Sequence, residues 1–434
     1  MVAPVIISAL TILSMVLVVL FKPYIKVGRI RLGLYWLVCL FGAVLMLIFS
    51  QVSLKEAWQG ITKQSAVNPL KILALFLSMT LLSIYLGDAG FFYLVANKVF
   101  AKNSKGGKKL FILLYVTVAV LTTFTSNDIV ILTFTPPICI FCKRAKISPI
   151  PFLIAEFIAA NTWSMALVIG NPTNIYLAQT AGITFWEYLS TMWLPTLVGG
   201  MISLAVLLLI FNKTLQQKVS NTEKSEKIAT ADYPAMIVAL VILALTIILL
   251  AISDIIRVES WLICVIMAGV LTIFNIVYDL IKYKTLLKVY FTFRKAPYEL
   301  IPFLLSMFVI VLGLESCNFT SILSKVLIAN NKIDFISFGY LSAGASNLLN
   351  NIPMSVLFEK IINGFSDNNY AVYGAIVGSN IGAFITPIGA LAGIMWNKIL
   401  SDYEVKISFS KFILYGVSVA IPTILATTLT LLII

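Results

Sequence analysis

The feature that most constrains this chain is a series of apolar runs, many of them about 20 residues long, separated by short charged gaps. An α-helix needs about 20 apolar residues to cross the ~30 Å hydrocarbon core of a bilayer. Hydrophobic residues make up 60% of the 434-residue chain and charged residues only 11%, whereas soluble domains carry about 25% charged residues. These values exclude a soluble globular enzyme, a disordered chain and a disulfide-stapled secreted module. They predict an all-α polytopic membrane protein.

Ten of the runs are predicted to cross the membrane as helices. They are Val2–Phe21, Leu32–Ser50, Ile72–Phe92, Pro149–Leu177, Ser190–Phe211, Tyr233–Ser253, Ser260–Ile281, Leu300–Leu314, Tyr370–Trp396 and Phe412–Ile434. The first run has no charged leader and no small-residue cleavage site, so we expect a membrane span there rather than a signal peptide.

Two further apolar stretches are interrupted by polar residues. Their arms are 14 residues long in Phe111–Phe124 and Ile129–Cys142, and 11 residues long in Phe335–Ala345 and Ile352–Ile362. At ~1.5 Å per residue, such arms reach only about half to two thirds of the way across a bilayer. We therefore predict two re-entrant hairpins, at 109–142 and 335–362. One long tilted helix at each place is the alternative.

The distribution of Lys and Arg agrees with two hairpins that do not cross. In that topology 24 of the 31 basic residues lie in cytoplasmic gaps, as the positive-inside rule requires. The other seven are Lys55, Lys63, Lys71, Arg257, Lys325, Lys332 and Lys360. The net charge of +13 is therefore explained by the orientation of the chain in the membrane and by the attraction of its basic residues to anionic lipid at the inner face. No nucleic-acid-binding motif accompanies it, so no nucleic acid is expected as a partner.

The two halves of the chain share motifs at an almost constant offset. Ser126-Asn127 recurs 220 residues later as Ser346-Asn347. Asn161 recurs 219 residues later as Asn380, and Gly170 recurs at the same offset as Gly389. Three matches at the same places in each half indicate an internal repeat.

The repeat predicts a division of the chain into two halves of opposite orientation. Each half would hold five crossings and one hairpin, and an odd number of crossings inverts the second half relative to the first. We expect a first repeat at 1–212, a cytoplasmic linker at 213–232 and a second repeat at 233–434. Transporters with inverted repeats place their substrate at the midplane, between broken helices.

Two broken helices are predicted, at 149–177 and 370–396. The breaks are Gly170-Asn171-Pro172-Thr173-Asn174 and Thr386-Pro387-Ile388-Gly389. Proline removes a backbone donor and collides with the preceding turn, so each break should unwind its helix near mid-depth. Unwound carbonyls bind cations, and half-helix N-termini offer N–H groups to an anion or to a neutral oxyacid.

Polar groups at membrane depth are costly unless they line a cavity, so the hairpin tips and the breaks supply the candidate substrate and ion site. Asn is well suited to it, because its side chain both donates and accepts. The candidates are Ser126, Asn127, Asp128, Asn161, Gly170, Asn171, Thr173, Asn174, Ser346, Asn347, Asn350, Asn351, Asn380, Thr386 and Gly389. For each Asn the alternative is a helix cap or an interhelical hydrogen bond, and for each Gly it is close helix packing.

Three acids are candidates for a group that couples transport to protons. Asp128, at the first tip, is the leading one, with an N-cap as its alternative role. Asp88 and Glu156 are the others, and either could instead pair with a nearby Lys.

The sequence offers little for metal chemistry or catalysis. It contains no His, and its CxxC pair, Cys139 and Cys142, lacks the second pair that a four-ligand site needs. A thiophilic ion or plain apolar packing would account for these two thiols. We expect no metal, no cofactor and no enzymatic activity.

Together these motifs resemble the ion transporter superfamily, and most closely the arsenical pump membrane protein (arsenite permease) family. The resemblance rests on Asp88-Ala89-Gly90-Phe91-Phe92, Ser126-Asn127-Asp128, Gly170-Asn171-Pro172-Thr173-Asn174-Ile175, Asn350-Asn351-Ile352-Pro353 and Ile385-Thr386-Pro387-Ile388-Gly389. It implies a scaffold domain and a transport domain, elevator-type alternating access, a plasma-membrane location and a homodimer. Two features depart from the family pattern: Asn161 stands where many members carry an acid, and Asn171-Pro172-Thr173-Asn174 is closer to sodium-coupled relatives.

The implied activity is extrusion of arsenite or antimonite, by proton antiport or with a separate ATPase subunit. The chain has no phosphate-binding loop of the Walker type, so ATP use would come from that partner. Two alternatives stay open: a sodium-coupled symporter of di- or tricarboxylates, and a sodium/proton antiporter.

Overall fold

The computed structural model describes residues 2–22, 24–27, 30–62, 68–102, 106–216, 231–329, 335–362 and 369–434. In these ranges the chain is built almost entirely of helices, which confirms the all-α prediction. Seven helices are long and apolar enough to cross a membrane, and Leu300–Ser316 together with Phe319–Lys325 makes an eighth candidate, bent by 71°. Most of the predicted linker at 213–232 lies outside the described residues.

The first half contains ten α-helices among its described residues. They are α1 (Val2–Phe21), α2 (Leu34–Ile48), α3 (Leu54–Thr62), α4 (Pro69–Asp88), α5 (Phe91–Lys102), α6 (Gly107–Phe124), α7 (Asn127–Ala145), α8 (Ile150–Trp163), α9 (Pro172–Thr180) and α10 (Phe185–Phe211).

The second half follows the same order with different lengths. Its helices are α11 (Tyr233–Ala251), α12 (Ser253–Ile256), α13 (Ser260–Tyr283), α14 (Leu287–Arg294), α15 (Leu300–Ser316), α16 (Phe319–Ala329), α17 (Phe335–Leu349), α18 (Asn351–Ile362), α19 (Asn369–Gly382), α20 (Leu391–Asp402) and α21 (Phe409–Leu431).

Local sequence signals explain where several helices begin. The Asn68 side chain accepts hydrogen bonds from the N–H groups of Leu70 and Lys71, and Pro69 occupies the first turn, so α4 starts there. At α10, Thr184 and Glu187 form a reciprocal capping box. Both caps replace hydrogen bonds that a helix N-terminus lacks.

The structure corrects the predicted crossings in three places. The predicted crossing 72–92 is α4 followed by a turn at Gly90, which has a φ of 91° and starts a second helix, α5. The crossing 300–314 similarly continues as the bent pair α15 and α16. The crossing 32–50 is shortened to α2, because its first residues belong to β2 (Ile30–Gly33), which pairs with β1 (Tyr24–Val27) in a small antiparallel ribbon. Short β-ribbons carry too weak a pattern to be seen beside apolar helices.

Over the first stretch predicted as a hairpin, α6 and α7 are two antiparallel helices that lie along α8, and α6 is itself long and apolar enough to cross a membrane. Thr122, near the end of α6, donates to Ala160 O at 3.1 Å, and Asn127, at the start of α7, donates to Asn161 Oδ1 at 3.1 Å. Further along α7, Thr135 contacts Glu156. The arms are 18 and 19 residues long rather than 14, because both helices continue past their apolar part into basic residues.

The second hairpin, α17 and α18, lies along α19 in the same manner. Ser342 on α17 contacts Gly374 O, and Asn347, one turn from the tip, donates to Gly382 O at 2.9 Å. The return is marked by Phe358 on α18, whose ring lies 6.2 Å from that of Phe338 on α17. Its arms are 15 and 12 residues long.

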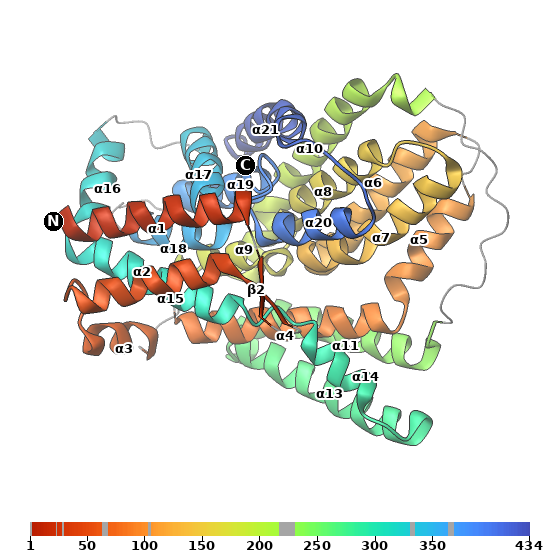
Figure 1. Ribbon diagram of the computed structural model, residues 1–434, viewed down its shortest axis with the longest axis horizontal. Helices are drawn as coiled ribbons and strands as arrows, with labels where there is room; N and C mark the ends of the chain where they lie inside the picture. Colours follow the sequence, from red (N-terminus) through yellow and green to blue (C-terminus); the bar gives the residue numbers. More distant parts are fainter. Residues whose placement is uncertain are drawn as a thin grey trace.

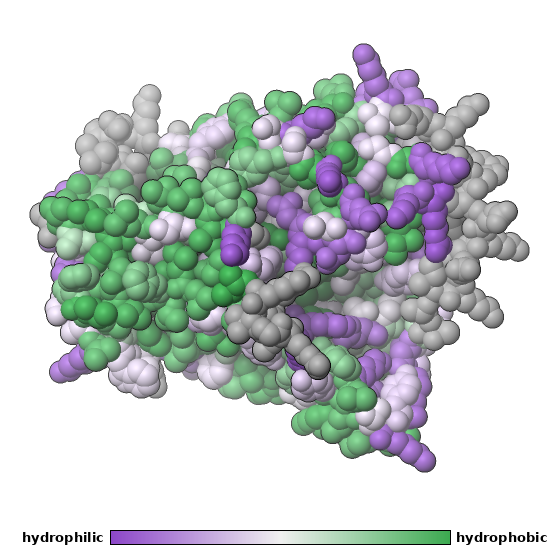
Figure 2. Space-filling view, in the orientation of Figure 1, coloured by the Kyte–Doolittle hydropathy of each residue, from purple (hydrophilic) through white to green (hydrophobic). Residues whose placement is uncertain are grey.

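The outer helix pairs are exchanged between the halves. α1 and α2 of the first half pack against α15 of the second, whereas α11 and α13 of the second half pack against α4 of the first. Figure 1 shows α1, α2 and α15 side by side at the left, and α4, α11 and α13 along the lower edge. In Figure 2, the surface over α1 and α2 is mostly apolar and hydrophilic residues gather at the end where α6 begins and α13 ends.

Candidate functional site

The first break interrupts the span between α8 and α9. Two short 3-10 turns, Ser164–Ala166 and Val168–Gly170, separate the helices. Asn171 then caps α9 by accepting the Thr173 N–H at 3.2 Å. The turns fold so tightly that a Cβ on Gly170 would lie 2.2 Å from Ser164 O. The Gly-Asn-Pro sequence is therefore needed to bend the chain back on itself.

The second break lies between Gly382, the last residue of α19, and Leu391, the first of α20. Its polar contact is Thr386, whose N–H and hydroxyl both donate to Asn347 Oδ1, at 2.9 and 2.7 Å. A Cβ on Gly389 would lie 3.0 Å from the same oxygen. The hairpin tip thus rests directly on the unwound segment.

Asn380, near the end of α19, joins the second half of the chain to the first break. Its Oδ1 accepts from Ser164 Oγ at 2.8 Å and from Asn171 Nδ2 at 2.9 Å. Its Nδ2 donates to Asn174 Oδ1 at 2.6 Å and to Ile376 O at 2.8 Å. All four hydrogen-bonding positions of this buried amide are used, three of them by the opposite half of the chain.

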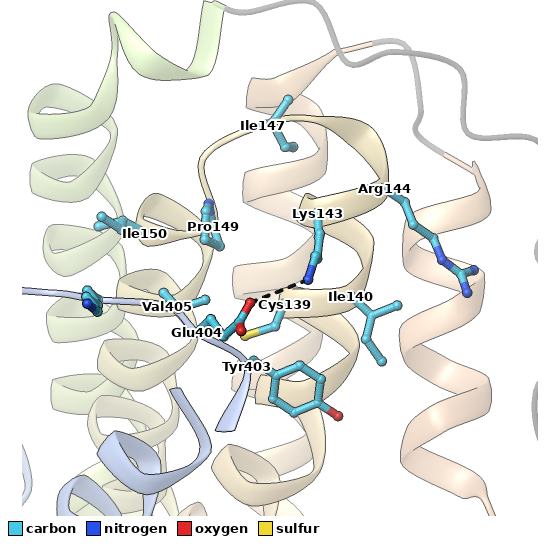
Figure 3. Close-up of a pocket in the computed structure, with 11 residues that line it drawn as sticks. Cys139, Ile140, Lys143, Arg144, Ile147, Pro149, Ile150, Tyr403, Glu404 and Val405 are labelled. Atoms are coloured by element: carbon cyan, nitrogen blue, oxygen red, sulfur yellow. Dashed lines mark ion pairs between the residues drawn. The ribbon is translucent and has the colours of Figure 1, made fainter. Parts of the chain in front are cut away.

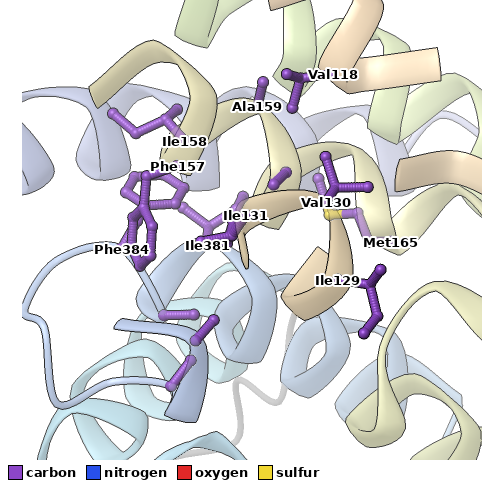
Figure 4. Packing of buried hydrophobic residues seen from close by; sticks show 14 of the residues in the cluster. Val118, Ile129, Val130, Ile131, Phe157, Ile158, Ala159, Met165, Ile381 and Phe384 are labelled. Atoms are coloured by element: carbon purple, nitrogen blue, oxygen red, sulfur yellow. The ribbon is translucent and has the colours of Figure 1, made fainter. Parts of the chain in front are cut away.

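A hydroxyl pair adds a further link between the halves beside Asn380: Thr173 and Ser379 lie 2.7 Å apart. The Ser164 hydroxyl also donates to Asn161 O at 2.7 Å, which connects this network to α8 and the first hairpin. The packing around it is apolar: Figure 4 shows Ile131 of α7 beside Ile381, and Phe157 of α8 beside Phe384.

The first hairpin tip is held by few polar contacts. Asn127 donates to Asn161 Oδ1, and Asn161 in turn donates to Phe157 O at 2.8 Å. Asn127 Oδ1 and Ser126 Oγ are buried and have no hydrogen-bond partner in the described part of the chain. Buried acceptors without partners are rare, and they mark places where a ligand, an ion or water binds.

The second hairpin tip has more contacts. Besides the Thr386 bonds, Asn347 donates to Ala343 O at 2.7 Å and to Gly382 O. Asn350, which forms the turn with a φ of 74°, donates to Ile388 O at 3.0 Å, and the Asn351 N–H donates to Gly389 O. Among the described residues, Ser346 Oγ is again buried without a partner, as is its first-half counterpart Ser126.

The candidate residues therefore form one connected region, but the three acids are separated. Asp128 lies half-buried in the first turn of α7, beside the tip. Asp88 lies away from the centre, paired with Lys295 and accepting from Thr292 at 2.6 Å, so it has the lysine partner that was its alternative role. Glu156 is buried and forms no ion pair with a described basic residue, so the alternative of a lysine partner finds no support among the described residues.

Sequence reasoning missed four polar residues of this region. Ser164 and Ser379 complete the Asn380 network, and Thr135 contacts Glu156. Glu359 is a second buried carboxyl, on α18, with Lys360 Nζ 3.7 Å away. Ser379 directly precedes the repeated Asn380, and that adjacency could have drawn attention to it; the others have no match at the repeat offset.

Two cavities reach the breaks from opposite ends. One of 290 Å³, at the end predicted to be outside, is lined by Val168 and Ile169 of the first break and by Lys71 and Trp261. One of 460 Å³, at the predicted cytoplasmic end, is lined by Pro387 of the second break and by Asn397 and Ser401. Val168 and Pro387 are related by the 219-residue offset of the repeat.

A larger cavity of 570 Å³ adjoins the cytoplasmic one (Figure 3). It is lined by Cys139, Lys143 and Arg144 of α7 and by the loop from Tyr403 to Lys406, and a 3.8 Å ion pair joins Lys143 to Glu404. No cluster of three or more metal-ligating side chains occurs among the described residues.

Comparison with known proteins identifies the family. The family model described as Citrate transporter (CitMHS) matches residues 15–373, which is most of the chain. The chain belongs to this family of membrane transporters. Together with its apolar spans, this makes it a multi-pass protein of the plasma membrane and confirms a transport function.

Several named relatives of this family member are arsenical pumps. The arsenical pump membrane protein of Escherichia coli strain K12 is 26% identical over 412 residues, covering 91% of this chain and 92% of that protein. The one from Yersinia enterocolitica is 25% identical over 369 residues, covering 82% and 84%. The rice silicon efflux transporter LSI3 is 28% identical over 210 residues, covering 44% and 41%. The resemblance to the arsenical pump family noted from the motifs is thereby confirmed.

A solved structure supports the fold. The YdaH transporter of Alcanivorax borkumensis matches with a TM-score of 0.59, over 99% of this chain and 97% of that chain, at 13% identity. At this identity the likeness shows the fold alone.

Proposed function

We propose that the protein is a secondary active transporter that exports neutral trivalent oxyacids such as arsenous and antimonous acid. The observation that carries the proposal is the chemistry of the centre. The hydrogen-bonding groups of the candidate site are amides and hydroxyls. The basic residues that form the described ion pairs lie outside this site. Arsenous acid is uncharged at neutral pH and presents only hydroxyl groups, which Asn and Ser bind by donating and accepting.

The unpartnered acceptors at the first tip support a binding role there. A hydroxyl of the substrate would donate to Asn127 Oδ1 or Ser126 Oγ and relieve the cost of burying these oxygens without a partner. An oxyanion would be repelled by such acceptors, and it would need donors. The tip therefore favours a protonated oxyacid over an anion.

We infer alternating access of the elevator type. In this proposal, the paired groups α1–α2–α15 and α11–α13–α4 form the scaffold, and the hairpins with the broken helices carry the substrate. The cavities on opposite sides of the two breaks support it, since each gives one break a route to one face. We further propose that protons moving inward drive export, and that the protein works as a homodimer. An ATPase subunit would be a separate chain.

A second candidate is a sodium-coupled symporter of di- or tricarboxylates. The symmetric pair of unpartnered hydroxyls, Ser126 and Ser346, favours it, because oxygen ligands of this kind bind sodium. The description of the matching family model, a citrate transporter, also favours it. Against it stands the neutral centre, which offers a carboxylate no basic side chain in the described region.

Transport by purified protein in proteoliposomes tests the proposal. Uptake of antimonite, arsenite, citrate and succinate would each be measured under a proton gradient and under a sodium gradient. We expect antimonite and arsenite transport that depends on the proton gradient and is indifferent to sodium. Sodium-driven citrate or succinate uptake without metalloid transport would contradict the proposal and establish the second candidate. A sodium/proton exchange without any organic or metalloid substrate would contradict both.

A further inference from the structure

Glu156 is a buried carboxyl near the predicted cytoplasmic end of the protein. It lies in the second turn of α8, its exposed fraction is 0%, and it faces Thr135 of α7 and Trp396 of α20. Among the described residues it forms no ion pair. Cys139, one turn further along α7, is the titratable side chain within its electrostatic reach. A charged carboxylate in such a place is costly unless it is neutralised.

The hydrogen bonds of Thr135 indicate how it is neutralised. Thr135 Oγ1 lies 2.6 Å from Ile131 O and 3.0 and 3.1 Å from the two carboxyl oxygens of Glu156. A hydroxyl carries one proton, and the shortest contact, to a carbonyl that can only accept, takes it. The one Thr135 proton cannot satisfy Ile131 O and both carboxyl oxygens at the same time. A proton on the Glu156 carboxyl supplies the donor that this group of oxygens lacks.

Glu156 is also close to water. Cys139, beside it on α7, lines the 570 Å³ cavity that opens at the cytoplasmic end (Figure 3). A proton released from the carboxyl can therefore leave past Cys139 to this cavity. The cavity lies toward the start of α8, whereas the substrate tip contacts Asn161, five residues after Glu156.

We propose that Glu156 carries the coupling proton: it is a carboxylic acid in this conformation and releases its proton to the cytoplasmic cavity during each transport cycle. In the release step the O–H bond breaks, the electron pair stays on the carboxyl oxygen, and a water molecule of the cavity takes the proton. After the change to the outward-open conformation, a hydronium ion on the outer side gives a proton to the carboxylate and reloads the acid, so that each cycle moves one proton inward. This inference rests on the proposed proton-driven function.

The other acids differ from Glu156 in ways that support this assignment. Glu359, the buried carboxyl of the outer half, has Lys360 Nζ 3.7 Å away, and Glu315 shares that charge at 3.4 Å. Asp128 is half-buried in the first turn of α7, beside the substrate tip. Asp88 is paired with Lys295. Among these four acids, Glu156 is the one that is fully buried and forms no ion pair with a described residue, so a proton is left to neutralise it.

An infrared spectrum of the purified protein tests the protonation state directly and needs no substrate. We expect the difference between wild type and Glu156→Gln at neutral pH to contain the carbonyl band of a protonated carboxyl. The matched control, Asp402→Asn, removes an exposed carboxylate on α20 and should show only a carboxylate band. A Glu156→Gln difference spectrum with a carboxylate band instead would overturn the proposal, whatever the protein transports.

Proton flux tests the coupling role. In liposomes loaded with a pH dye, antimonite added on one side should move protons with the wild type and with Asp402→Asn. Glu156→Gln should still carry antimonite down its own gradient, while antimonite-driven proton flux falls at least about tenfold. Thr135→Val, which removes the oxygen that accepts the carboxyl proton, should shift the pH midpoint of transport without abolishing it. Full proton coupling in Glu156→Gln would overturn the assignment, and antimonite transport by the wild type without proton movement would overturn the proposed function instead.

Discussion

The two hairpin tips start from the same Ser-Asn pair but end in different environments. Asn347 in the second tip uses both amide hydrogens and accepts two hydrogen bonds from Thr386, so its tip is fastened to the second break. Asn127 in the first tip makes one side-chain hydrogen bond and leaves its oxygen without a partner among the described residues. The second break contains Thr386 to reach its tip, whereas the first break turns its polar side chains toward Asn380.

This difference separates two roles that the repeated motif alone cannot distinguish. In the second tip the Asn347 amide is fully hydrogen-bonded and holds the break in place, and among the described residues Ser346 Oγ lacks a partner. In the first tip both Asn127 Oδ1 and Ser126 Oγ lack a described partner, so we propose that binding a hydroxylated solute gains most there. In this proposal one tip mainly supports the fold and the other binds, although both carry the same Ser-Asn pair.

The largest effect is expected where both halves meet, at Asn380. Asn380→Ala removes three hydrogen bonds to the first half and leaves Ser164, Asn171 and Asn174 without those partners. Each buried group deprived of a partner costs about 1–3 kcal/mol. We expect transport in proteoliposomes to be lost and Tm in detergent to fall by more than in any other variant described below.

Asn275→Ala is the matched control for that substitution. Asn275 is a buried amide on α13 whose side chain donates a hydrogen bond to Leu271 O in its own helix. Its loss should lower Tm only slightly. Equal losses of Tm in the two variants would contradict a special role for the contact between the halves.

Close packing behind the second tip provides the next prediction. A Cβ on Gly378 would lie 2.0 Å from Ser342 Oγ and 2.1 Å from Gly339 O, both on α17. Gly378→Ala should therefore push α17 away from α19 at a cost of about 1–3 kcal/mol, measured as a lower Tm. Gly269→Ala on α13, where a Cβ meets no atom within 4 Å, should leave Tm unchanged or raise it. If the two alanines behave alike, α17 is not held tightly against α19.

The comparison of the tips becomes sharpest when each Asn is replaced in turn. Asn347→Ala should lower Tm clearly, because it leaves Thr386 and Gly382 without their hydrogen bonds. Asn127→Ala should change Tm little and raise the KM for antimonite about tenfold, since it removes a group reserved for the substrate. Measuring Tm and KM for both variants separates the roles. The reverse pattern would mean that the second tip binds and the first one supports.

The sequence predicts much of this arrangement and misses what depends on contacts across the fold. The apolar runs and the polar tips at 125–128 and 346–351 predict two pairs of helices joined by polar turns. Pro172 and Pro387 predict the breaks, because proline interrupts the helix in which it lies. The pairing of Asn380 with Asn171 and Asn174 joins residues more than 200 positions apart, and no local pattern encodes it. The packing of α1 and α2 against the second half, and of α11 and α13 against the first half, cannot be predicted from the sequence for the same reason.

The smallest effect is expected far from both tips, at Asp232. Burial alone would raise the pKa of this carboxyl, but hydrogen bonds from Tyr278, Lys282 and Tyr283 and the charge of Lys288 outweigh burial and hold the pKa well below the usual range of an aspartate. A lowered pKa stabilises the folded protein above the unfolded value, near pH 4, and this contribution is lost as the pH falls further. Asp232→Asn should lower Tm by a few degrees at pH 7.

The pH dependence supplies the check on that prediction. The difference in Tm between wild type and Asp232→Asn should shrink as the pH drops below about 4, because the unfolded chain then binds a proton at Asp232 while the folded chain still keeps the carboxylate charged. A difference that stays constant well below pH 4 would mean that the ion pairs with Lys282 and Lys288 do not stabilise the fold.

The measurement that tests the central claim most directly is a cryo-electron microscopy map of the full chain in lipid nanodiscs with saturating antimonite. Antimony scatters strongly enough to locate one bound solute. We predict its density within hydrogen-bonding distance of Asn127 Oδ1 or Ser126 Oγ. Asn380 of α19 should remain hydrogen-bonded to the first break. Density at the second tip or outside the region between the hairpins, or continuous helix through Ser126 and Asn127, would contradict the account.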